Sequence, residues 1–411
     1  MFTFIDNNFP MKKSWLLFLL LLTCDKSFSQ NLLSKGSWRF VFHLNDSTEL
    51  PFNVDVKEKT IDIINADEHI SLDEIFYAGD SIFMKLPVFD SELRGKISGD
   101  KISGSFLNHA RKDHNVIPFF AEHKSYRFLE HPAPPLFNMT GRWAAKFADD
   151  EPPLDLSIGE FVQTGNHLTG TFLTSTGDYR YLEGIVSGNE FRLSCFDGFH
   201  VYLFTGTYKN GILNGLYYSG VHGYDTWTAK RNEQAVLPNE DSLAFLKPGY
   251  DHISFSFPDA DSNLVSLSDK KFQNKIVILQ IMGSWCPNCM DETSFLAPFY
   301  NEYKNKGVEI IGLDFERIAE FSTAKKNLAR LKRRFGIEYT LLFAGNSDRK
   351  LRCDPLPMLS DVVSFPTTIF IDRHNKVRRI HTGFSGPATG GHYEKWKENF
   401  YRFVDQLIME K

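Results

Sequence analysis

The chain has 411 residues, 42% of them hydrophobic and 24% charged, so it is long enough for roughly two or three domains and too apolar to be disordered. Its 46 Lys and Arg residues against 51 Asp and Glu residues give a net charge of −5, which argues against a nucleic-acid-binding protein. Five cysteines are too few for a disulfide-built scaffold, whereas 38 Phe, 15 Tyr and 6 Trp residues favour pleated strands.

Residues 1–29 have the layout of a signal peptide. Two lysines precede the apolar run 15–22, which is too short to cross a bilayer, and small residues follow it. We therefore expect export of the mature chain to an extracytoplasmic, periplasmic location, where disulfides persist. The stretch Leu21-Leu22-Thr23-Cys24 resembles a bacterial lipobox, so lipid anchoring through Cys24 is the alternative.

The chain from about residue 34 to residue 230 has the pattern of short strands separated by turns. Polar and apolar residues alternate in 52–56 and 81–86, and Gly, Asn and Asp residues form turn signals at 98–100 and 210–211. The pattern contains no convincing helix. An all-β region of hairpin-connected antiparallel strands is therefore expected.

This β region contains an internal repeat. The matching segments, first copy then second, are 36–40 with 141–147, 72–83 with 182–191, and 98–106 with 208–216. We predict two copies, 30–130 and 136–231, each with room for about eight strands of an antiparallel barrel-like domain. The Pro-rich stretch 131–135 is expected to separate them as a stiff spacer. The Gly-x-Trp start of each copy resembles the first strand of lipocalin-like barrels, so ligand binding and a scaffold or docking role both stay open.

A linker at 232–247 ends the all-β region, and a mixed α/β domain is expected over 248–411. The apolar run 275–282 predicts a strand buried on both faces. It leads into Cys286-Pro287-Asn288-Cys289 and then into a helical pattern. Cys286 is therefore expected at a helix N-terminus, where free N–H groups and the helix dipole lower the pKa of a thiol.

The spacing of Cys286 and Cys289 predicts a redox-active pair. Cys286, the more exposed of the two, would form a mixed disulfide with a partner, and Cys289 would resolve it by attacking the Cys286 sulfur. Half of a zinc site is the alternative, but zinc needs two further ligands at suitable spacing and Cys353 is solitary. We expect no metal and no cofactor other than the cysteine pair.

A second motif, Phe365-Pro366-Thr367 at the start of an apolar strand, completes the pattern. X-Pro bonds are where cis peptides occur. A Trp-Cys-x-x-Cys junction followed by Pro-Thr before a strand resembles the thioredoxin fold, and residues 255–408 resemble its TlpA/ResA-like branch of extracytoplasmic thiol–disulfide oxidoreductases. The expected fold is thus an N-terminal all-β part, with tandem antiparallel barrel-like repeats, followed by an α/β thioredoxin-like domain.

The resemblance also implies roles for individual residues. Pro366 would be a cis-proline facing the cysteine pair, and Phe365 and Thr367 would join it in binding a substrate strand. Trp285 would shield the disulfide. Glu316 falls where relatives carry an acidic residue, and its carboxylate would take the Cys289 proton, the alternative being a solvated loop charge.

Three further positions complete the set of expectations. Gln280 stands where thioredoxin has a buried Asp, so the route of the proton must differ. Cys195 lies in an alternating strand and is expected in a core. Cys353 is either a third redox thiol or a bystander.

The resemblance implies a reductase of protein disulfides, supplied by a membrane or periplasmic electron donor. An oxidase or isomerase on the same fold is one alternative. A β-region binding module with an accessory thioredoxin domain is another, and the intact cysteine pair with Pro366 argues against it. A peroxidase is disfavoured because Gly283 stands where such enzymes carry a Thr.

Overall fold

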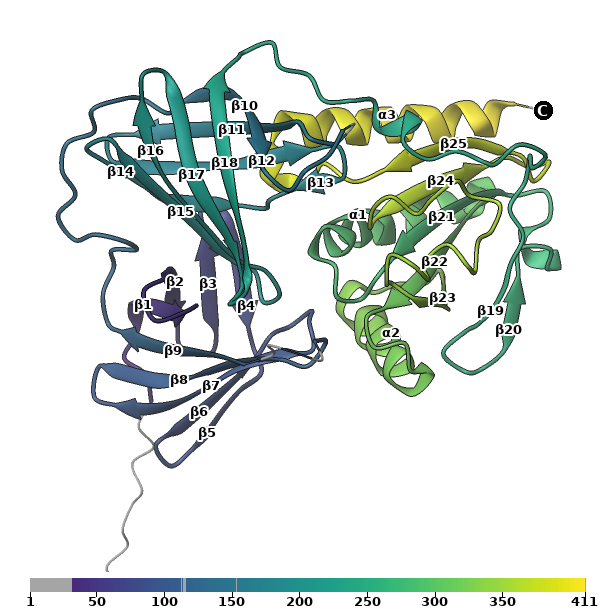
Figure 1. Cartoon of the computed structure of the whole chain (residues 1–411). Coiled ribbons are helices and arrows are strands. Elements are labelled where there is room, and N and C mark those ends of the chain that lie inside the picture. Colours follow the sequence, from purple (N-terminus) through teal and green to yellow (C-terminus); the bar gives the residue numbers. More distant parts are fainter. Residues whose placement is uncertain (1–31, 112, 114–115, 153, 411) are drawn as a thin grey trace, which may run out of the picture.

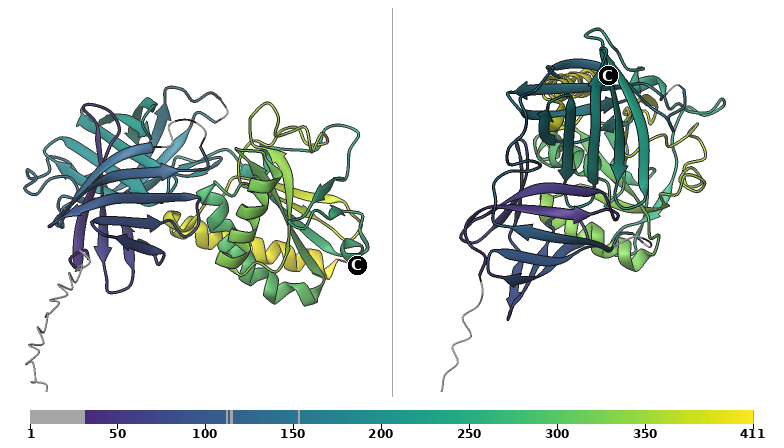
Figure 2. Two further views of the ribbon diagram at one scale, coloured as in Figure 1. Left: turned by 90° about the horizontal axis from the view of Figure 1, so that it is seen from below. Right: turned by 60° about the vertical axis from the view of Figure 1, so that its left-hand side comes forward.

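A computed structural model describes residues 32–410 apart from 112, 114–115 and 153. Two all-β domains occupy the N-terminal part, and an α/β domain lies beside them (Figures 1 and 2). The predicted signal peptide 1–29 and Cys24 fall outside the described residues. Within the described part of the chain, no helix is both long and apolar enough to cross a membrane.

The first β domain is one antiparallel sheet of nine strands in the order β4-β3-β2-β1-β9-β8-β7-β6-β5, with β4 and β5 at its edges. Residues from across this sheet share one core cluster, so the sheet curves around it. Its strands are β1 (Gly36–His43), β2 (Glu49–Val56), β3 (Ile61–Asn65), β4 (Glu68–Leu72), β5 (Ile75–Ala78), β6 (Ser81–Lys85), β7 (Ser91–Ser98), β8 (Lys101–Asn108) and β9 (Val116–Glu122).

The second β domain, named the second barrel, is closed into a ring of strands. Its order is β11-β10-β18-β17-β16-β15-β14-β12, and pairing of β11 with β12 closes the ring, with β13 attached to β12. Its strands are β10 (Gly141–Phe147), β11 (Ser157–Thr164), β12 (His167–Thr174), β13 (Gly177–Asp178), β14 (Leu182–Ser187), β15 (Glu190–Phe196), β16 (Val201–Lys209), β17 (Ile212–Ser219) and β18 (Gly223–Arg231). The expectation of barrel-like antiparallel repeats is confirmed, with nine strands in each copy where the sequence had suggested about eight.

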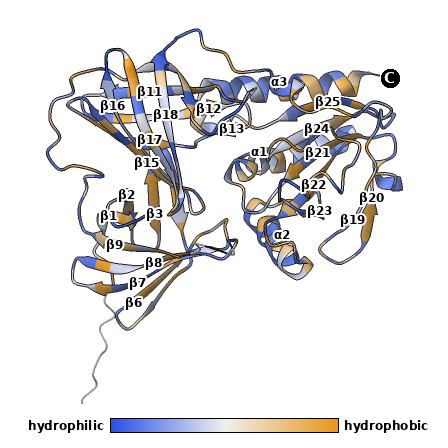
Figure 3. Ribbon diagram, in the orientation of Figure 1, coloured by the Kyte–Doolittle hydropathy of each residue, from blue (hydrophilic) through white to orange (hydrophobic). Residues whose placement is uncertain are grey.

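The two copies match in detail at their first strands. Gly36 and Gly141 both have positive φ, 109° and 117°, a conformation that side chains disfavour. The indole N–H of Trp38 donates to the carbonyl of Ser34 at 2.8 Å, and that of Trp143 donates to Met139 at 2.9 Å. The Gly-x-Trp signature therefore marks a strand start at which a buried tryptophan bonds back to the preceding chain. Figure 3 shows hydrophobic and hydrophilic residues along the same strands, as expected for strands with one buried face.

The second barrel fills the core of the first sheet. Phe196, at the end of β15, is fully buried, and its ring lies 4.8 to 5.0 Å from the rings of Phe52, Phe42 and Phe106. The side chain of Asn65 bonds the backbone of Phe196 at both its N–H and its carbonyl. The predicted spacer is also docked, because Pro135 forms a bridge with Gly188 of the second barrel. The two β domains thus pack as one unit.

The C-terminal domain contains a five-stranded sheet in the order β23-β22-β21-β24-β25. Strands β21, β22 and β23 are parallel to one another, β24 is antiparallel to β21, and β25 is antiparallel to β24. A two-stranded sheet, β19 (Ser256–Pro258) with β20 (Leu264–Ser266), precedes it. Its main elements are β21 (Ile276–Met282), α1 (Pro287–Tyr303), β22 (Val308–Glu316), α2 (Phe321–Phe335), β23 (Thr340–Asn346), β24 (Thr367–Ile371), β25 (Val377–Thr382) and α3 (Gly391–Met409). Short 3-10 helices are η1 (Glu240–Ser242), η2 (Lys270–Phe272), η3 (Lys304–Lys306) and η4 (Pro387–Thr389).

Strand β21 is buried on both faces, as its continuous apolar run predicts. Ile276 and Ile278 belong to the core that the three α-helices cover, whereas Val277 and Leu279 belong to the core on the opposite face. That opposite face is covered by irregular segments, including the 232–247 linker, which pairs with the C-terminal domain through a bridge between Leu246 and Leu359. The linker is therefore docked on the domain that it precedes.

We predict that Phe196→Ala destabilises both β domains together, because the ring is carried by a strand of the second domain and packs in the core of the first. The expected loss is about 3–5 kcal/mol in the free energy of unfolding, measured by chemical denaturation. Phe76→Ala, at an exposed position of β5, is the matched control and should cost less than about 0.5 kcal/mol. A loss at Phe196 as small as that of the control would contradict docking of the two domains through this ring.

Candidate active site

Cys286 lies at the junction between β21 and α1. It is the N-cap residue of α1, with extended φ and ψ of −99° and 110°, and Pro287 occupies the first turn, where its missing N–H leaves no bond unmade. The backbone N–H of Cys289 donates to the sulfur of Cys286 at 3.1 Å. A charge-bearing sulfur at this position faces the positive end of the helix dipole, so the fold favours the Cys286 thiolate.

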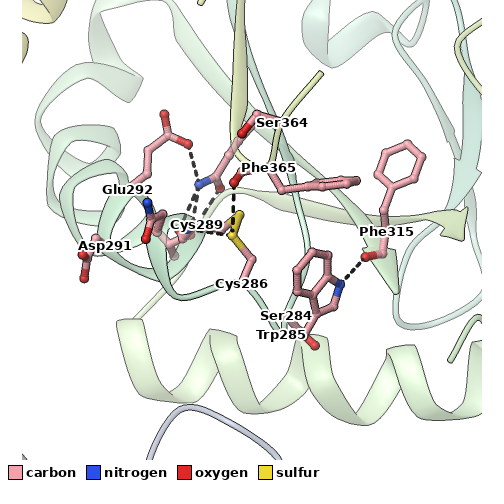
Figure 4. Close-up of a disulfide and its surroundings, with 12 residues drawn as sticks. Ser284, Trp285, Cys286, Cys289, Asp291, Glu292, Phe315, Ser364 and Phe365 are labelled. Atoms are coloured by element: carbon pink, nitrogen blue, oxygen red, sulfur yellow. Dashed lines mark hydrogen bonds between the residues drawn. A yellow bond between two sulfur atoms is a disulfide. The ribbon is translucent and has the colours of Figure 1, made fainter. Parts of the chain in front are cut away.

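Cys286 and Cys289 form a disulfide, with their Cα atoms 5.2 Å apart (Figure 4). Cys289 is fully buried and Cys286 is 5% exposed, so Cys286 is the more accessible sulfur, by a small margin. The exposure of Cys286 is small because residues of the second β domain lie opposite it across a shared cavity.

The Phe365–Pro366 peptide bond is cis and lies opposite the cysteine pair. The carbonyl oxygen of Phe365 is 3.4 Å from the sulfur of Cys286. Thr367 is buried, and its hydroxyl donates to the carbonyl of Ser364 at 2.8 Å. The Thr367 side chain therefore holds the loop together and does not face the space in front of Cys286.

Trp285 flanks the disulfide on the side of Phe365 and Phe315 (Figure 4). Its indole N–H donates to the carbonyl of Phe315 at 2.9 Å, and its ring packs edge-on against Phe365 at 5.5 Å. The guanidinium of Arg317 lies 4.2 Å from the centre of the indole ring. These contacts fix the indole beside Cys286, where it restricts access to the sulfur.

Glu316 is buried at the end of β22, 2% exposed, which excludes the alternative of a solvated loop charge. Its carboxylate accepts a bond from Asn327 at 3.0 Å. Burial and the neighbouring Glu316 carboxylate raise the pKa of Asp314, which accepts a bond from the N–H of Ser284. Glu316 thus belongs to a buried acidic pair behind the Cys286 loop and does not line the cavity in front of Cys286.

Glu292 is a second buried acid beside the cysteine pair, and it was not among the residues predicted from the sequence. It lies one turn after Cys289 on α1, is fully buried, and accepts bonds from Gln280, at 2.9 Å, and Thr368. The Gln280 amide also donates to the carbonyl of Cys289 at 3.3 Å. Burial raises the pKa of Glu292 to about 7. The i, i+3 spacing from Cys289 was the available signal, because it places both residues on one helix face.

A cavity of about 340 Å³ lies in front of Cys286, between the redox domain and the second barrel. Of the predicted site residues, Trp285, Cys286 and Phe365 line it, whereas Cys289, Pro366, Thr367 and Glu316 do not. The other lining residues are Asp150, Leu154, Thr174, Thr176, Gly177, Asp178, Tyr179, His200, Tyr202, Tyr217, Pro287, Asn288 and Ser364.

The remaining cysteines lie elsewhere. Cys195 is fully buried in the second barrel, and burial raises its pKa. The Cys353 thiol donates to the carboxylate of Asp361 at 2.9 Å, and burial together with this carboxylate raises its pKa. Both thiols are therefore held in the unreactive, protonated form. Over the described ranges, no group of three or more His, Cys, Asp or Glu side chains is placed to hold a metal ion.

Comparison with known proteins agrees with this geometry. The model of the Redoxin family matches residues 248–392. The chain is 29% identical over 149 residues to the thiol-disulfide oxidoreductase ResA of Bacillus subtilis (strain 168), a match that covers 36% of this chain and 73% of that protein. ResA of Bacillus thuringiensis subsp. konkukian is 32% identical over 124 residues, which cover 30% of this chain and 63% of that protein.

Among solved structures, a thiol-disulfide oxidoreductase from Bacteroides fragilis matches 36% of this chain and 99% of its own, with 19% identity and a TM-score of 0.27. The Redoxin match, residues 248–392, contains both the Cys286–Cys289 pair and the cis Phe365–Pro366 bond. The C-terminal part of the chain is therefore a Redoxin domain with a thioredoxin-like fold, and the chain is similar in sequence to the thiol–disulfide oxidoreductase ResA.

Proposed function

We propose that the chain is an extracytoplasmic reductase of protein disulfides that acts through the Cys286–Cys289 dithiol. The observation that carries the proposal is the position of Cys286 at the N-cap of α1, with Cys289 directly behind it. The expected signal peptide at 1–29 supports the location. The resemblance to the TlpA/ResA-like branch supports the direction of electron flow.

The reaction balances as a two-electron transfer. The Cys286 thiolate attacks one sulfur of a substrate disulfide, the substrate S–S bond breaks, and the first substrate thiolate leaves. Cys289 then loses its proton and attacks the Cys286 sulfur, which breaks the mixed disulfide and releases the second substrate thiolate. The substrate is reduced to two thiols, and the Cys286–Cys289 pair becomes a disulfide. An external dithiol donor must reduce this disulfide before the next cycle.

Glu292 is our candidate for the group that takes the Cys289 proton. It lies on the same face of α1 as Cys289. Gln280 donates to the Glu292 carboxylate and to the backbone carbonyl of Cys289, which holds the carboxylate beside the turn that carries the Cys289 thiol. A carboxylate with a pKa of about 7 can accept a proton near neutral pH and release it again. Gln280, which replaces the buried acid of thioredoxin, then orients the carboxylate and carries no proton itself.

An oxidase uses the same cysteine pair in the opposite direction, and an isomerase opens and re-forms substrate disulfides with no net electron transfer. The site geometry is common to all three activities. A pure binding module with an accessory redox domain is less well supported, because the cysteine pair, the cis Phe365–Pro366 bond and the flanking Trp285 are all in place.

Cys289→Ser should trap substrates as mixed disulfides on Cys286, because the resolving thiol is gone. Partners recovered from the extracytoplasmic fraction should separate from the protein only after reduction, as non-reducing electrophoresis with mass spectrometry would show. Cys286→Ser is the control and should trap none of them. The proposal fails if Cys289→Ser captures no partner and the wild-type protein reduces no model disulfide.

Glu292→Gln should lower kcat/KM for disulfide reduction on the order of 10²-fold at neutral pH, the size of a general-base contribution. Glu292 accepts a proton only when it is ionised, so the wild-type rate should rise as the pH increases through about 7. The variant should lack this inflection. The comparison is a pH profile from 5.5 to 8.5, and Glu302→Gln, an exposed acid later on α1, serves as the control. An unchanged inflection in Glu292→Gln would rule out this role.

A further inference from the structure

We propose that the second barrel forms part of the substrate site, so that the enzyme accepts disulfides on single flexible peptide segments and excludes those on folded protein surfaces. This inference rests on the proposed reductase function and names its substrate class. It also gives the β region a role in selecting the substrate.

The tip of the second barrel, residues 174–178 at the β12–β13 turn, contacts the elements on either side of Cys286. The hydroxyl of Ser364, in the cis-proline loop, donates to the carbonyl of Thr176 at 2.8 Å. On the helix side, the amide of Asn288 donates to the carbonyl of Asp178 at 3.2 Å. The turn therefore contacts the two elements between which a substrate strand would have to approach Cys286.

The barrel turn and the loops around Cys286 are so close that a glycine on each side leaves no room for a side chain. A Cβ atom on Gly177 would lie 2.5 Å from the amide nitrogen of Asn288, and one on Gly383 would lie 2.7 Å from the backbone of Thr176. Both glycines have positive φ, 143° and 80°. Glycine at these positions is what allows the turn to lie against the active-site loops.

Charged groups hold the turn in place. The carboxylate of Asp178 accepts a bond from the N–H of Gly386 at 2.7 Å, and the guanidinium of Arg180 pairs with Asp291, two residues after Cys289. At the other end of the interface, His392 at the start of α3 pairs with Glu160 of β11 at 3.0 Å. The interface thus consists of several specific contacts around the disulfide.

The remaining space suits a narrow substrate. A volume of about 340 Å³ is at the small end of the range of ligand pockets. Cys286 is only 5% exposed, so a rigid, convex protein surface cannot bring its disulfide to the sulfur. A single peptide segment can enter the cavity and present one cysteine.

The cavity walls also indicate what lies next to that cysteine. Tyr179, Tyr202 and Tyr217 come from the second barrel, and Trp285 and Phe365 come from the redox domain. Aromatic rings favour apolar and aromatic neighbours in offset or edge-on packing. We therefore expect the preferred peptide to carry an aromatic residue beside its cysteine.

The test compares the rates at which the protein reduces the same type of disulfide on a flexible peptide and on a folded protein. A flexible peptide with a Phe-Cys pair and a folded carrier protein with one surface cysteine are each converted to the mixed disulfide with glutathione. Wild-type protein should reduce the peptide with a kcat/KM at least about tenfold higher than the carrier, and a Ser-Cys peptide should be intermediate. When Cys286 attacks the peptide or carrier sulfur, glutathione leaves in both cases, so the ratio of the two rates reports access of that sulfur to Cys286.

Two variants examine the barrel itself. Asp291→Ala loosens the interface and should lower the peptide-to-carrier ratio about threefold or more, whereas Glu302→Ala, an acid on the same helix outside the interface, should leave the ratio unchanged. Leu154→Trp, on the barrel side of the cavity, should reduce kcat/KM for the peptide about tenfold. Leu136→Trp, at a site 78% exposed, is its matched control.

Equal rates on peptide and carrier by the wild-type protein would overturn the inference and leave the reductase proposal standing. The same conclusion would follow if Leu154→Trp reduced the peptide as well as its control does. Failure of the wild-type protein to reduce either substrate would instead contradict the proposed function. If Asp291→Ala does not fold, the Leu154→Trp comparison still decides the matter.

Discussion

One buried arginine joins the three domains of the chain. Arg180, 5% exposed, pairs with Glu68 of the first sheet at 2.6 Å, with Asp197 of the second barrel at 3.4 Å, and with Asp291 of α1. Burial raises the pKa of Glu68, and the guanidinium opposes this effect by stabilising the carboxylate. Removing one member of a buried charge network leaves the others unpaired at a cost of several kcal/mol, so the three domains are held in one relative placement.

The chemistry of the site depends on that placement. The α/β domain alone supplies the helix N-terminus that favours the Cys286 thiolate, the cis Phe365–Pro366 loop and the buried Glu292. The second barrel supplies the opposite wall, which limits the exposure of Cys286 to 5%. A site that combines an activated sulfur with restricted access can react rapidly with some disulfides and exclude others. The aromatic residues that enrich this chain also line this wall, where Tyr202 and Tyr217 face the cavity.

The sequence was sufficient for the parts that depend on local pattern. The Cys-x-x-Cys junction, the Phe365-Pro366 motif and the β-strand repeat are each encoded by residues close together in the chain. It was not sufficient for Glu292, because an Asp-Glu pair on a helix is usually solvated, and its burial depends on the distant residue Thr368. Nor could it indicate Arg180, whose partners lie 17 to 112 residues away and meet only when the domains pack. Contacts between domains leave no periodic signal in any one segment.

The direction of electron flow through the site depends on the reduction potential of the Cys286–Cys289 pair. Equilibration of the purified full-length protein with glutathione buffers, followed by quantification of the two thiols, gives this potential. A reductase should have a value near the −270 mV of thioredoxin, at about that figure or below. A value near −120 mV, about that of the oxidant DsbA, would show that the pair accepts electrons from its substrates and would contradict the proposed reductase activity.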